Sequence, residues 1–219
     1  LIPNYGTKIK NPLNKNVYGI INFAILNNDI MKELNTYMNH ADYSEAIRFF
    51  LEKGEKQVYC KKEFYVHQNA VSRYAGYVQE GLFHYICTGE DGKEHVVGYS
   101  FENEFVCDYS SFIGGTNSLV SIRALTDSIV YSISLDDYLV YTNRMQDGLH
   151  LGCRIANGLF EMSYKRLLTL YCDTPEMRYI SLMKQCPMLK EKVSLKEIAS
   201  FLGVSPETVS HIRKKLLDK

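Results

Sequence analysis

Short runs of β-branched and aromatic residues dominate the chain from Gln57 to Ser134. They alternate with turn residues at a spacing of roughly ten residues, a pattern typical of antiparallel barrels and sandwiches. The runs are QVYC, EFYV, YAGYVQ, LFHYICT, HVVGYS, NEFV, SLVSIRAL and SIVYSIS. Asp91–Gly92, which separates two of them, is a good hairpin signal. The pattern therefore predicts an antiparallel β-barrel or sandwich with a hairpin at this dipeptide.

Helical periodicity replaces this pattern on both sides. Before the runs, the segment 43–53 has apolar residues at helical spacing and a glycine directly after it. After the runs, Ser134 can cap a helix over 135–143, whose first turn holds two aspartates. The segment 173–176 combines a polar cap candidate, a proline and an acid, and so predicts another helix start, which leads into a helix that stops before Pro187.

A long segment without proline, 147–171, lies between these helices. One apolar stripe follows it at helical spacing, formed by Leu151, Ile155, Leu159 and Met162. A helix of this kind spans about 37 Å and is longer than most globular helices. Because such a helix between two domains often pairs with its twin, we interpret it as a dimerisation helix. The alternative is a long core helix within one subunit.

The segment SLKEIASFLGVSPETVSHIRKKL, which starts at Ser194, has the pattern of two short helices around a turn. Ser194 and Glu197 can form a capping box, and Gly203 suits a turn with positive φ. Ser205 can cap the second helix, which Pro206 opens. The inner faces consist of Ile198, Ala199, Leu202, Val209, Ile212 and Leu216. Together these features predict a helix-turn-helix.

The second helix of this motif carries groups that suit base edges and phosphates. The expected DNA contacts are Ser205, Pro206, Glu207, Thr208, Ser210, His211, Arg213 and Lys214. From Pro187 onward the chain has seven basic and four acidic residues, a net charge of +3, so the rest of this neutral chain carries −3. A basic tail favours a polyanionic partner. A structural hairpin with a solvated basic face is the competing interpretation.

This order of elements resembles the Crp–Fnr family of bacterial transcription regulators, relatives of the catabolite activator protein. The resemblance covers about residues 43–217. It is strongest in EIASFLGVSPETVSHIRKKL and weaker in GLFHYICTGEDGKEHVVGYSFENEFVCDYSSF, which looks like a cyclic-nucleotide-binding barrel. It implies a homodimer through 147–172 on a palindromic duplex operator, with a small-ligand pocket coupled to the DNA-binding heads. It leaves contact with RNA polymerase open.

The family's base-reading positions fall on Pro206, Glu207 and His211. Glu207 matches the family's usual glutamate, whose carboxylate can accept a hydrogen bond from a cytosine amino group. Pro206 and His211 replace basic residues of the family. The operator sequence therefore does not follow from the resemblance.

The family's nucleotide-binding cassette is altered in this chain. The resemblance places its ribose-binding glutamate at Asp108 and its phosphate-binding arginine at Ser118. Ser118 has neither the charge nor the forked geometry that a phosphate site needs. We therefore expect an effector other than cyclic AMP, or a barrel without a ligand. The expected pocket residues are Asp108, Tyr109, Ser110, Ser111, Ser118 and Ser163, with Tyr164 as an alternative to Ser163.

Composition and motifs argue against several other classes of protein. A hydrophobic fraction of 46% and a charged fraction of 23% are typical of globular domains. The six cysteines are all at least 14 residues apart and form no C-x-x-C pair, so we interpret them as reduced, mostly buried thiols. We expect no metal and no cofactor, because His67, His84 and His95 are scattered.

Sequence signals for catalysis and for membranes are equally weak. The nucleophile-elbow, phosphate-loop and zinc-protease motifs do not occur, so we expect a protein that is not an enzyme. Neither a membrane-spanning apolar run nor a signal peptide is visible, which predicts a cytoplasmic location.

We therefore expect an α+β protein that binds DNA. Residues 1–30 form an N-terminal tail, 31–146 a cyclic-nucleotide-binding-like double-stranded β-barrel (jelly-roll) domain, 147–172 the dimerisation helix and 173–219 the helix-turn-helix domain. The alternative function is a dimeric interaction or ligand-binding barrel with a vestigial DNA-binding head.

Overall fold

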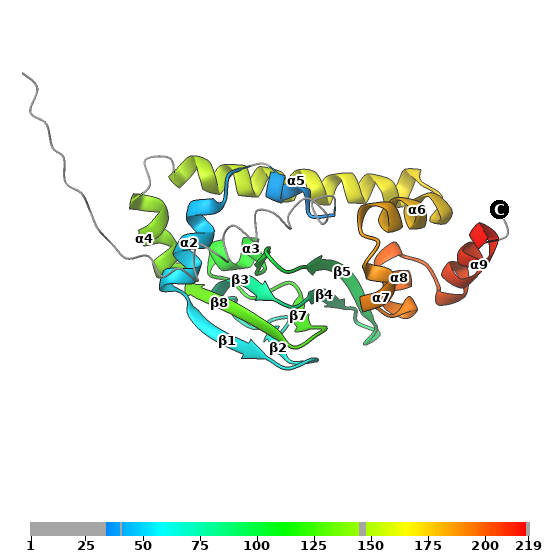
Figure 1. Ribbon diagram of the computed structural model, residues 1–219, viewed down its shortest axis with the longest axis horizontal. Helices are drawn as coiled ribbons and strands as arrows, with labels where there is room; N and C mark the ends of the chain where they lie inside the picture. Colours follow the sequence, from blue (N-terminus) through cyan, green and yellow to red (C-terminus); the bar gives the residue numbers. More distant parts are fainter. Residues whose placement is uncertain (1–33, 40, 145–147, 218–219) are drawn as a thin grey trace, which may run out of the picture.

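The computed structural model describes residues 34–39, 41–144 and 148–217 (Figure 1). The tail expected at 1–30 lies outside them. The strands are β1 (Glu55–Tyr59), β2 (Phe64–Val66), β3 (Tyr74–Glu80), β4 (Phe83–Thr88), β5 (Glu94–Ser100), β6 (Phe105–Val106), β7 (Ser121–Ala124) and β8 (Ser128–Ser134). The helices are η1 (Thr36–Asn39), α2 (Ser44–Lys53), α3 (Tyr109–Gly114), α4 (Leu135–Arg144), α5 (Gly148–Cys172), α6 (Pro175–Gln185), α7 (Leu189–Lys192), α8 (Leu195–Leu202) and α9 (Pro206–Leu217).

The strands form two four-stranded antiparallel sheets in a jelly-roll-like arrangement. One sheet has the order β1-β8-β3-β6 and the other the order β2-β7-β4-β5. Inward-facing apolar residues of both sheets make a shared core of Val78, Phe83, Val106, Ile122, Ala124 and Val130. Each of the eight predicted runs contains a strand, so the expected α+β fold with an antiparallel β-barrel is confirmed.

Two glycine turns in the barrel show why the sequence needs glycine there. Gly92 has φ +74° and its N–H donates to the carbonyl of Gly89 at 3.0 Å, which closes the predicted β4–β5 hairpin. Gly81, between β3 and β4, has φ +108°, and a Cβ at this position would lie 2.0 Å from Oγ of Ser128. A side chain at Gly81 would therefore both strain the backbone and collide with Ser128 at the start of β8.

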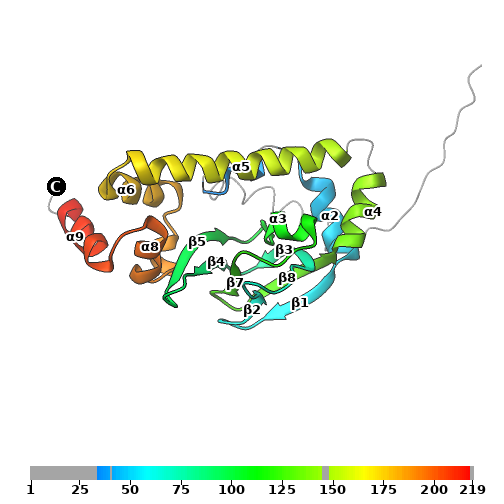
Figure 2. The ribbon, with the colours of Figure 1, turned by 180° about the vertical axis from the view of Figure 1, so that it is seen from behind.

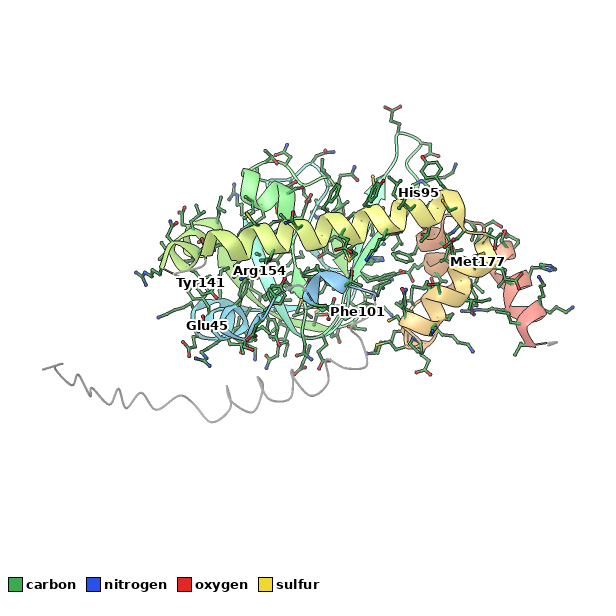
Figure 3. All side chains as sticks on the ribbon, turned by 90° about the horizontal axis from the view of Figure 1, so that it is seen from above. Glu45, His95, Phe101, Tyr141, Arg154 and Met177 are labelled. Atoms are coloured by element: carbon green, nitrogen blue, oxygen red, sulfur yellow. The ribbon has the colours of Figure 1, made fainter. Side chains whose placement is uncertain are left out.

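Helix α5 runs along the barrel and reaches the C-terminal helices (Figures 1 and 2). Viewed from above, it crosses the molecule between the ends marked by Tyr141 and Met177 (Figure 3). Its predicted apolar stripe faces the same chain, where Leu151 is buried and Ile155 partly buried in one cluster with residues of η1, α2, α3, β3 and β8. The main neighbours of α5 are η1 and α4. This stripe therefore belongs to the core of one subunit, and the dimerisation predicted for the helix stays a prediction.

A second apolar row on α5 was not foreseen from the sequence. It is exposed in the single chain and consists of Phe160, Tyr164, Leu167, Leu168 and Tyr171. The rings of Phe160 and Tyr164 are stacked with their centroids 5.8 Å apart.

The C-terminal helices α6 to α9 share one apolar cluster with the near end of the barrel. Tyr99 and Phe101 of the barrel belong to the same cluster as Ile198 and Val209 of the head. Helix α6 begins where the sequence predicts, because the hydroxyl of Thr174 accepts the N–H of Met177 at 3.3 Å. The short helix α7 was not foreseen.

Two further expectations have mixed outcomes. All six cysteines are free thiols, but only Cys186 is buried, so their predicted burial is wrong. Cys60, Cys153 and Cys172 are exposed. Among the helices in the described part of the chain, none is both long enough and apolar enough to cross a membrane.

Candidate functional site

Helices α8 and α9 form the predicted helix-turn-helix. Ser194 accepts the N–H of Glu197 at 3.2 Å while the Glu197 carboxylate accepts the N–H of Ser194 at 3.1 Å, which completes the capping box. Gly203 then ends α8 in the left-handed conformation, with φ +67°. Ile198 and Val209 are fully buried where the two helices pack together. Local sequence signals thus account for the turn that joins α8 to α9.

The start of α9 is held by its own hydroxyl groups. Oγ of Ser205 accepts the N–H of Thr208 at 3.2 Å and lies 3.1 Å from the hydroxyl oxygen of Thr208. The hydroxyl of Ser205 therefore caps the helix, and Pro206 occupies its first position half-buried. As the chain stands, Ser205 and Thr208 stabilise the helix end; their hydroxyls can still contact a phosphate.

The outer face of α9 presents Glu207, Ser210, His211 and Lys214 to solvent. A hydrogen bond to its own backbone N–H and one from Ser205 lower the pKa of Glu207, so its carboxylate remains ionised at neutral pH. The face thus combines a carboxylate acceptor, a hydroxyl, an imidazole and an ammonium group. These are groups that read base edges and phosphates in a major groove.

Arg213 differs from the expectation that it faces outward. Its Nε donates to the hydroxyl of Tyr179 on α6 at 3.0 Å, and its guanidinium lies 5.9 Å from the centre of that ring. Nearby, Nζ of Lys215 lies 2.5 Å from a carboxylate oxygen of Glu176, also on α6. Because Arg213 lies on the α6 side of the helix, it packs α9 against the head.

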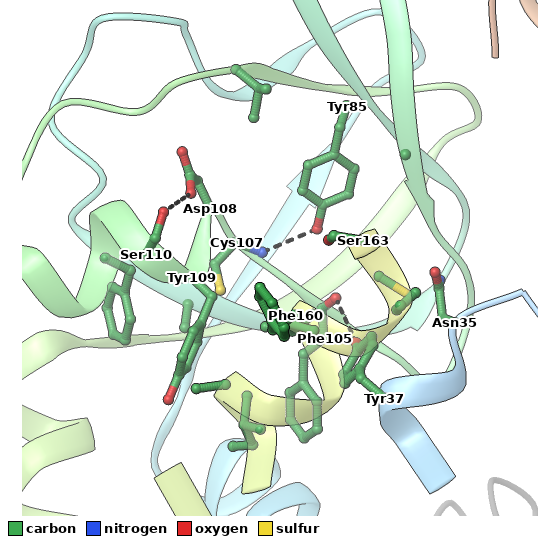
Figure 4. A pocket seen from close by; sticks show the side chains of 18 of the residues that line it. Asn35, Tyr37, Tyr85, Phe105, Cys107, Asp108, Tyr109, Ser110, Phe160 and Ser163 are labelled. Atoms are coloured by element: carbon green, nitrogen blue, oxygen red, sulfur yellow. Dashed lines mark hydrogen bonds between the residues drawn. The ribbon is translucent and has the colours of Figure 1, made fainter. Parts of the chain in front are cut away.

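A cavity of about 570 Å³ lies between the barrel, α2, α4 and α5 (Figure 4). Of the expected pocket residues, Asp108, Tyr109, Ser110 and Ser163 line it. Ser111 and Ser118 do not, because both are buried behind its wall. Tyr164 is outside the lining and 51% exposed on α5.

The carboxylate of Asp108 joins two segments of the cavity wall, the start of α3 and residues 118–119, by hydrogen bonds. Its carboxylate accepts the N–H of Leu119 at 2.8 Å and the hydroxyls of Ser111 at 2.9 Å, Ser110 at 3.1 Å and Ser118 at 3.2 Å. It also caps α3 through the N–H of Ser111. The oxygens of Asp108 are thus engaged by the chain itself and do not extend into the cavity as free acceptors.

Apart from Asp108, whose pKa is lowered, the titratable groups of the cavity wall with a shifted pKa are neutral at physiological pH. Burial raises the pKa of Tyr43 and of Tyr141 to about 12. Burial also raises the pKa of the Cys107 thiol to about 12, with Asp108 adding to the effect. Since a raised pKa keeps these groups protonated, they act as hydrogen-bonding or apolar surface.

A polar junction that sequence reasoning missed joins the barrel to the head. The imidazole Nδ1 of buried His84 on β4 lies 3.3 Å from a carboxylate oxygen of Glu197 on α8, within ion-pair distance although not aligned for a hydrogen bond. The N–H of Val96 donates to the hydroxyl of Ser200 at 2.8 Å. The sequence marked Glu197 only as a capping residue, and no local signal relates it to His84.

Arg166 of α5 connects all three parts of the molecule. Its guanidinium donates to the carbonyl of Val97 in the barrel and to that of Phe201 in the head, the latter at 2.9 Å. It also lies 3.8 Å from the centre of the Phe201 ring. The long helix is thereby fixed to both the sensor barrel and the helix-turn-helix.

Comparisons with known proteins agree with this architecture. Residues 56–143 match the cyclic nucleotide-binding domain family. The fold is similar to FixK2 from Bradyrhizobium japonicum, with 16% identity, 75% of this chain and 85% of that chain covered, and a TM-score of 0.66. It is also similar to the c-di-GMP responsive global regulator CLP of Xanthomonas campestris, with 20% identity, coverage of 80% and 92%, and a TM-score of 0.64.

A third similar structure is a CooA mutant from Carboxydothermus hydrogenoformans, with 18% identity, coverage of 85% and 84%, and a TM-score of 0.63. No curated protein sequence matches the chain. Residues 56–143 are thus similar to the cyclic nucleotide-binding domain family, and the chain has the overall fold of these three solved structures.

Proposed function

We propose that this protein is a homodimeric, DNA-binding transcription regulator of the Crp–Fnr type, controlled by a small effector other than cyclic AMP. The observation that carries the proposal is the exposed polar face of α9 on a fully capped helix-turn-helix. Glu207, Ser210, His211 and Lys214 lie on this face at one end of the molecule (Figure 1). A helix so placed can enter a major groove while the rest of the chain stays clear of the duplex.

The exposed row on α5 supports a second copy of this chain as partner. Phe160 is 70% and Tyr171 83% exposed, although both belong to one apolar row. Contiguous exposed apolar surface marks interaction sites. Pairing two α5 helices along this row would place two heads side by side, which is the arrangement that a palindromic operator requires.

The cavity supports control by a small molecule. An occupant would touch Asp108 of the barrel and Ser163 of α5, and α5 leads to the head through Arg166. The described lining contains no lysine, arginine or histidine that could bind a cyclic phosphate. We therefore propose an effector that is not cyclic AMP.

The competing function is a dimeric ligand-binding or interaction module with a vestigial head. The observation that favours it is the placement of Arg213 and Lys215, which contact α6 and so reduce the free positive charge on α9. Under either function we expect a protein that is neither an enzyme nor dependent on a metal or cofactor. Contact with RNA polymerase belongs only to the first function.

A binding titration separates the two functions. Sheared genomic duplex DNA is titrated with the purified chain and with a variant in which Glu207, Ser210, His211 and Lys214 are all alanine. We expect the parent to bind and the variant to lose most of its affinity, because the substituted face makes the contacts. A variant with alanine at the exposed residues Glu52 and Lys53 of α2 should bind like the parent. Equal binding by all three proteins would support the vestigial head.

A further inference from the structure

We infer that the cavity beneath α5 takes an uncharged, predominantly apolar ring compound, an inference that rests on the proposed effector site. Its volume of about 570 Å³ is within the ~300–1,000 Å³ that small-molecule pockets span. The cavity lies where the barrel meets α2 and α5 (Figure 4), so an occupant would contact the barrel and the helix that leads to the head.

Aromatic side chains form a large part of the cavity wall. Eleven of its 27 residues are tyrosine or phenylalanine, among them Tyr43, Phe50, Tyr85, Phe105, Tyr109 and Phe160. Aromatic side chains provide large apolar contact area and prefer stacked or edge-to-face partners. Such a wall favours a planar ring over a flexible polar ligand.

The cavity disfavours anions because the hydrogen-bond donors that could bind an anion already donate to the carboxylate of Asp108. The backbone N–H of Leu119 and the hydroxyls of Ser111 and Ser118 all point to Asp108. Burial alone would raise the pKa of Asp108, but these hydrogen bonds outweigh it and lower the pKa, so the carboxylate is ionised. A second anion would meet a fixed negative charge in apolar surroundings and would find no cation in the described lining.

The cavity disfavours cations for a related reason. The oxygens of Asp108 are engaged by hydrogen bonds, so a cation would have to compete with at least four donors of the chain. The remaining acidic groups of the lining are neutral, because burial raises the pKa values of Cys107 and Tyr43 to about 12. Because the cavity disfavours both anions and cations, we expect its ligand to be an uncharged molecule.

One end of the cavity can hold a polar atom of such a molecule. Figure 4 shows Ser163 of α5 pointing toward the hydroxyl of Tyr85 on β4. The Tyr85 hydroxyl is 2.9 Å from Oγ of Ser100 and accepts the N–H of Cys107 at 3.3 Å, so its position is fixed. A single hydroxyl or carbonyl group on the ligand could bond to Ser163 at this end.

Two dyes with the same ring system test the ligand class directly. N-phenyl-1-naphthylamine is neutral, and 1-anilinonaphthalene-8-sulfonate adds one negative charge. We expect saturable, blue-shifted fluorescence of the neutral dye on the full chain and affinity for the sulfonate that is weaker by about tenfold or more, because an unpaired charge is costly to bury. Equal or tighter binding of the sulfonate would overturn the inference. So would displacement of the neutral dye by benzyltrimethylammonium at lower concentrations than by benzyl alcohol.

Matched variants show whether the dye occupies this cavity. Ser163→Trp places an indole in the lining, whereas Cys172→Trp places the same group on an exposed part of α5 outside the lining. We expect the first to weaken binding of the neutral dye by about tenfold and the second to change it by less than about twofold. If Ser163→Trp does not fold, as judged by circular dichroism, Ser163→Leu replaces it. Equal affinity of the cavity variant and the Cys172 variant would contradict the assignment.

The role of Asp108 has its own variant. Asp108→Asn keeps a good helix cap but removes the charge. We expect the ratio of the affinities of the neutral dye and the sulfonate to decrease, whatever the change in the affinity of the neutral dye itself; an unchanged ratio would contradict the role given to this carboxylate. No DNA is present in these titrations. A negative result would therefore refute the inferred ligand class, an uncharged apolar ring compound, without bearing on the proposed DNA binding. Failure of DNA binding would leave the dye result intact.

Discussion

The carboxyl group of Glu104 is buried in the barrel, and its hydrogen-bond partners in the described part of the chain are neutral. It accepts the side-chain amide of Asn35 at 2.5 Å and the N–H of Phe101 at 3.0 Å. Burial raises its pKa from 4.5 to about 7, although both hydrogen bonds act in the opposite direction. The folded chain therefore holds a proton here that the unfolded chain releases at lower pH.

This proton predicts a loss of stability with rising pH. The contribution of Glu104 is fully present below its unfolded pKa of 4.5 and is lost as pH rises through about 7. We expect urea unfolding to show a smaller free energy of unfolding at pH 8 than at about pH 5 for the parent, and a reduced difference for Glu104→Gln. An identical pH dependence of both proteins would rule out Glu104 as the cause.

Lys214 and Lys215 are neighbours in the sequence but differ in their surroundings. Lys214 is exposed on the outer face of α9, whereas Lys215 is paired with Glu176. We expect Lys214→Ala to weaken binding to all duplex sequences and to lower the slope of log affinity against log salt by roughly one unit, because one phosphate contact is lost. Lys215→Ala is the matched control, and its slope should change less. A larger change for Lys215 would reverse the assignment.

Glu207 is expected to act differently, because the proposed function places it at a base-reading position. Its exposed carboxylate can accept from a cytosine amino group, and that contact distinguishes bases. We expect Glu207→Ala to reduce discrimination at one base pair of each half-site by roughly 1–3 kcal/mol. Affinities for a set of single-base operator variants measure this, and equal discrimination by parent and variant would refute the role.

Single residues also show how far the sequence could define the sites. The caps at Ser194 and Ser205 were predictable because their partners are three residues away. The inward placement of Arg213 was not, because Tyr179 is 34 residues distant in the chain. The residues of the cavity were partly predictable. Asp108 lines the cavity as expected, whereas the hydroxyl of Ser118 bonds to Asp108 and Ser118 is not part of the lining.

At the level of elements, the alternation of apolar runs and turns was enough to predict all eight strands. Their pairing order was not available from the sequence, because β1 pairs with β8 and β2 with β7 across long separations. Helix α5 shows a different limit. Its predicted stripe, which includes Leu151 and Ile155, packs within the same chain, mainly beside η1 and α4. The exposed row could be identified only once this packing was known.

The exposed row of α5 leads to a prediction about assembly. A charge at Leu167, which is 47% exposed within the row, should oppose pairing because it would be buried against a second apolar surface. We expect Leu167→Asp to shift sedimentation from dimer towards monomer and to lower DNA affinity in parallel. Met177→Asp places the same charge on α6, at a residue that is 53% exposed, and should leave the dimer unchanged. A dimer that survives Leu167→Asp would locate the interface elsewhere.

Across the whole molecule, the head is held to the barrel by both apolar and polar contacts. Tyr99 lies against Phe201 with ring centroids 5.1 Å apart, and Arg166 bonds to carbonyls on both sides of the junction. Burial lowers the pKa of Arg166 to about 10, which still leaves it charged at neutral pH. The position of the head therefore depends on a helix that also lines the cavity.

Removing this connection should loosen the head. Arg166→Met keeps apolar contact with Phe201 but deletes the bonds to the two carbonyls. We expect faster hydrogen–deuterium exchange in α8 and β5 while the inner strands of the barrel exchange as before. Lys165→Met is the matched control, because Lys165 forms its ion pair within its own helix, with Glu161. Equal exchange in both variants would show that apolar packing alone holds the junction.

The central claim is that α9 reads duplex DNA in a dimer. The most direct test is in vitro selection of duplex DNA from a random pool by the purified chain, at physiological salt, with and without a small-metabolite extract. We predict a palindromic motif whose half-sites are about one helical turn apart, roughly 34–36 Å. Enrichment only with the extract would agree with an effector-dependent reader. No enriched motif under either condition would contradict the claim.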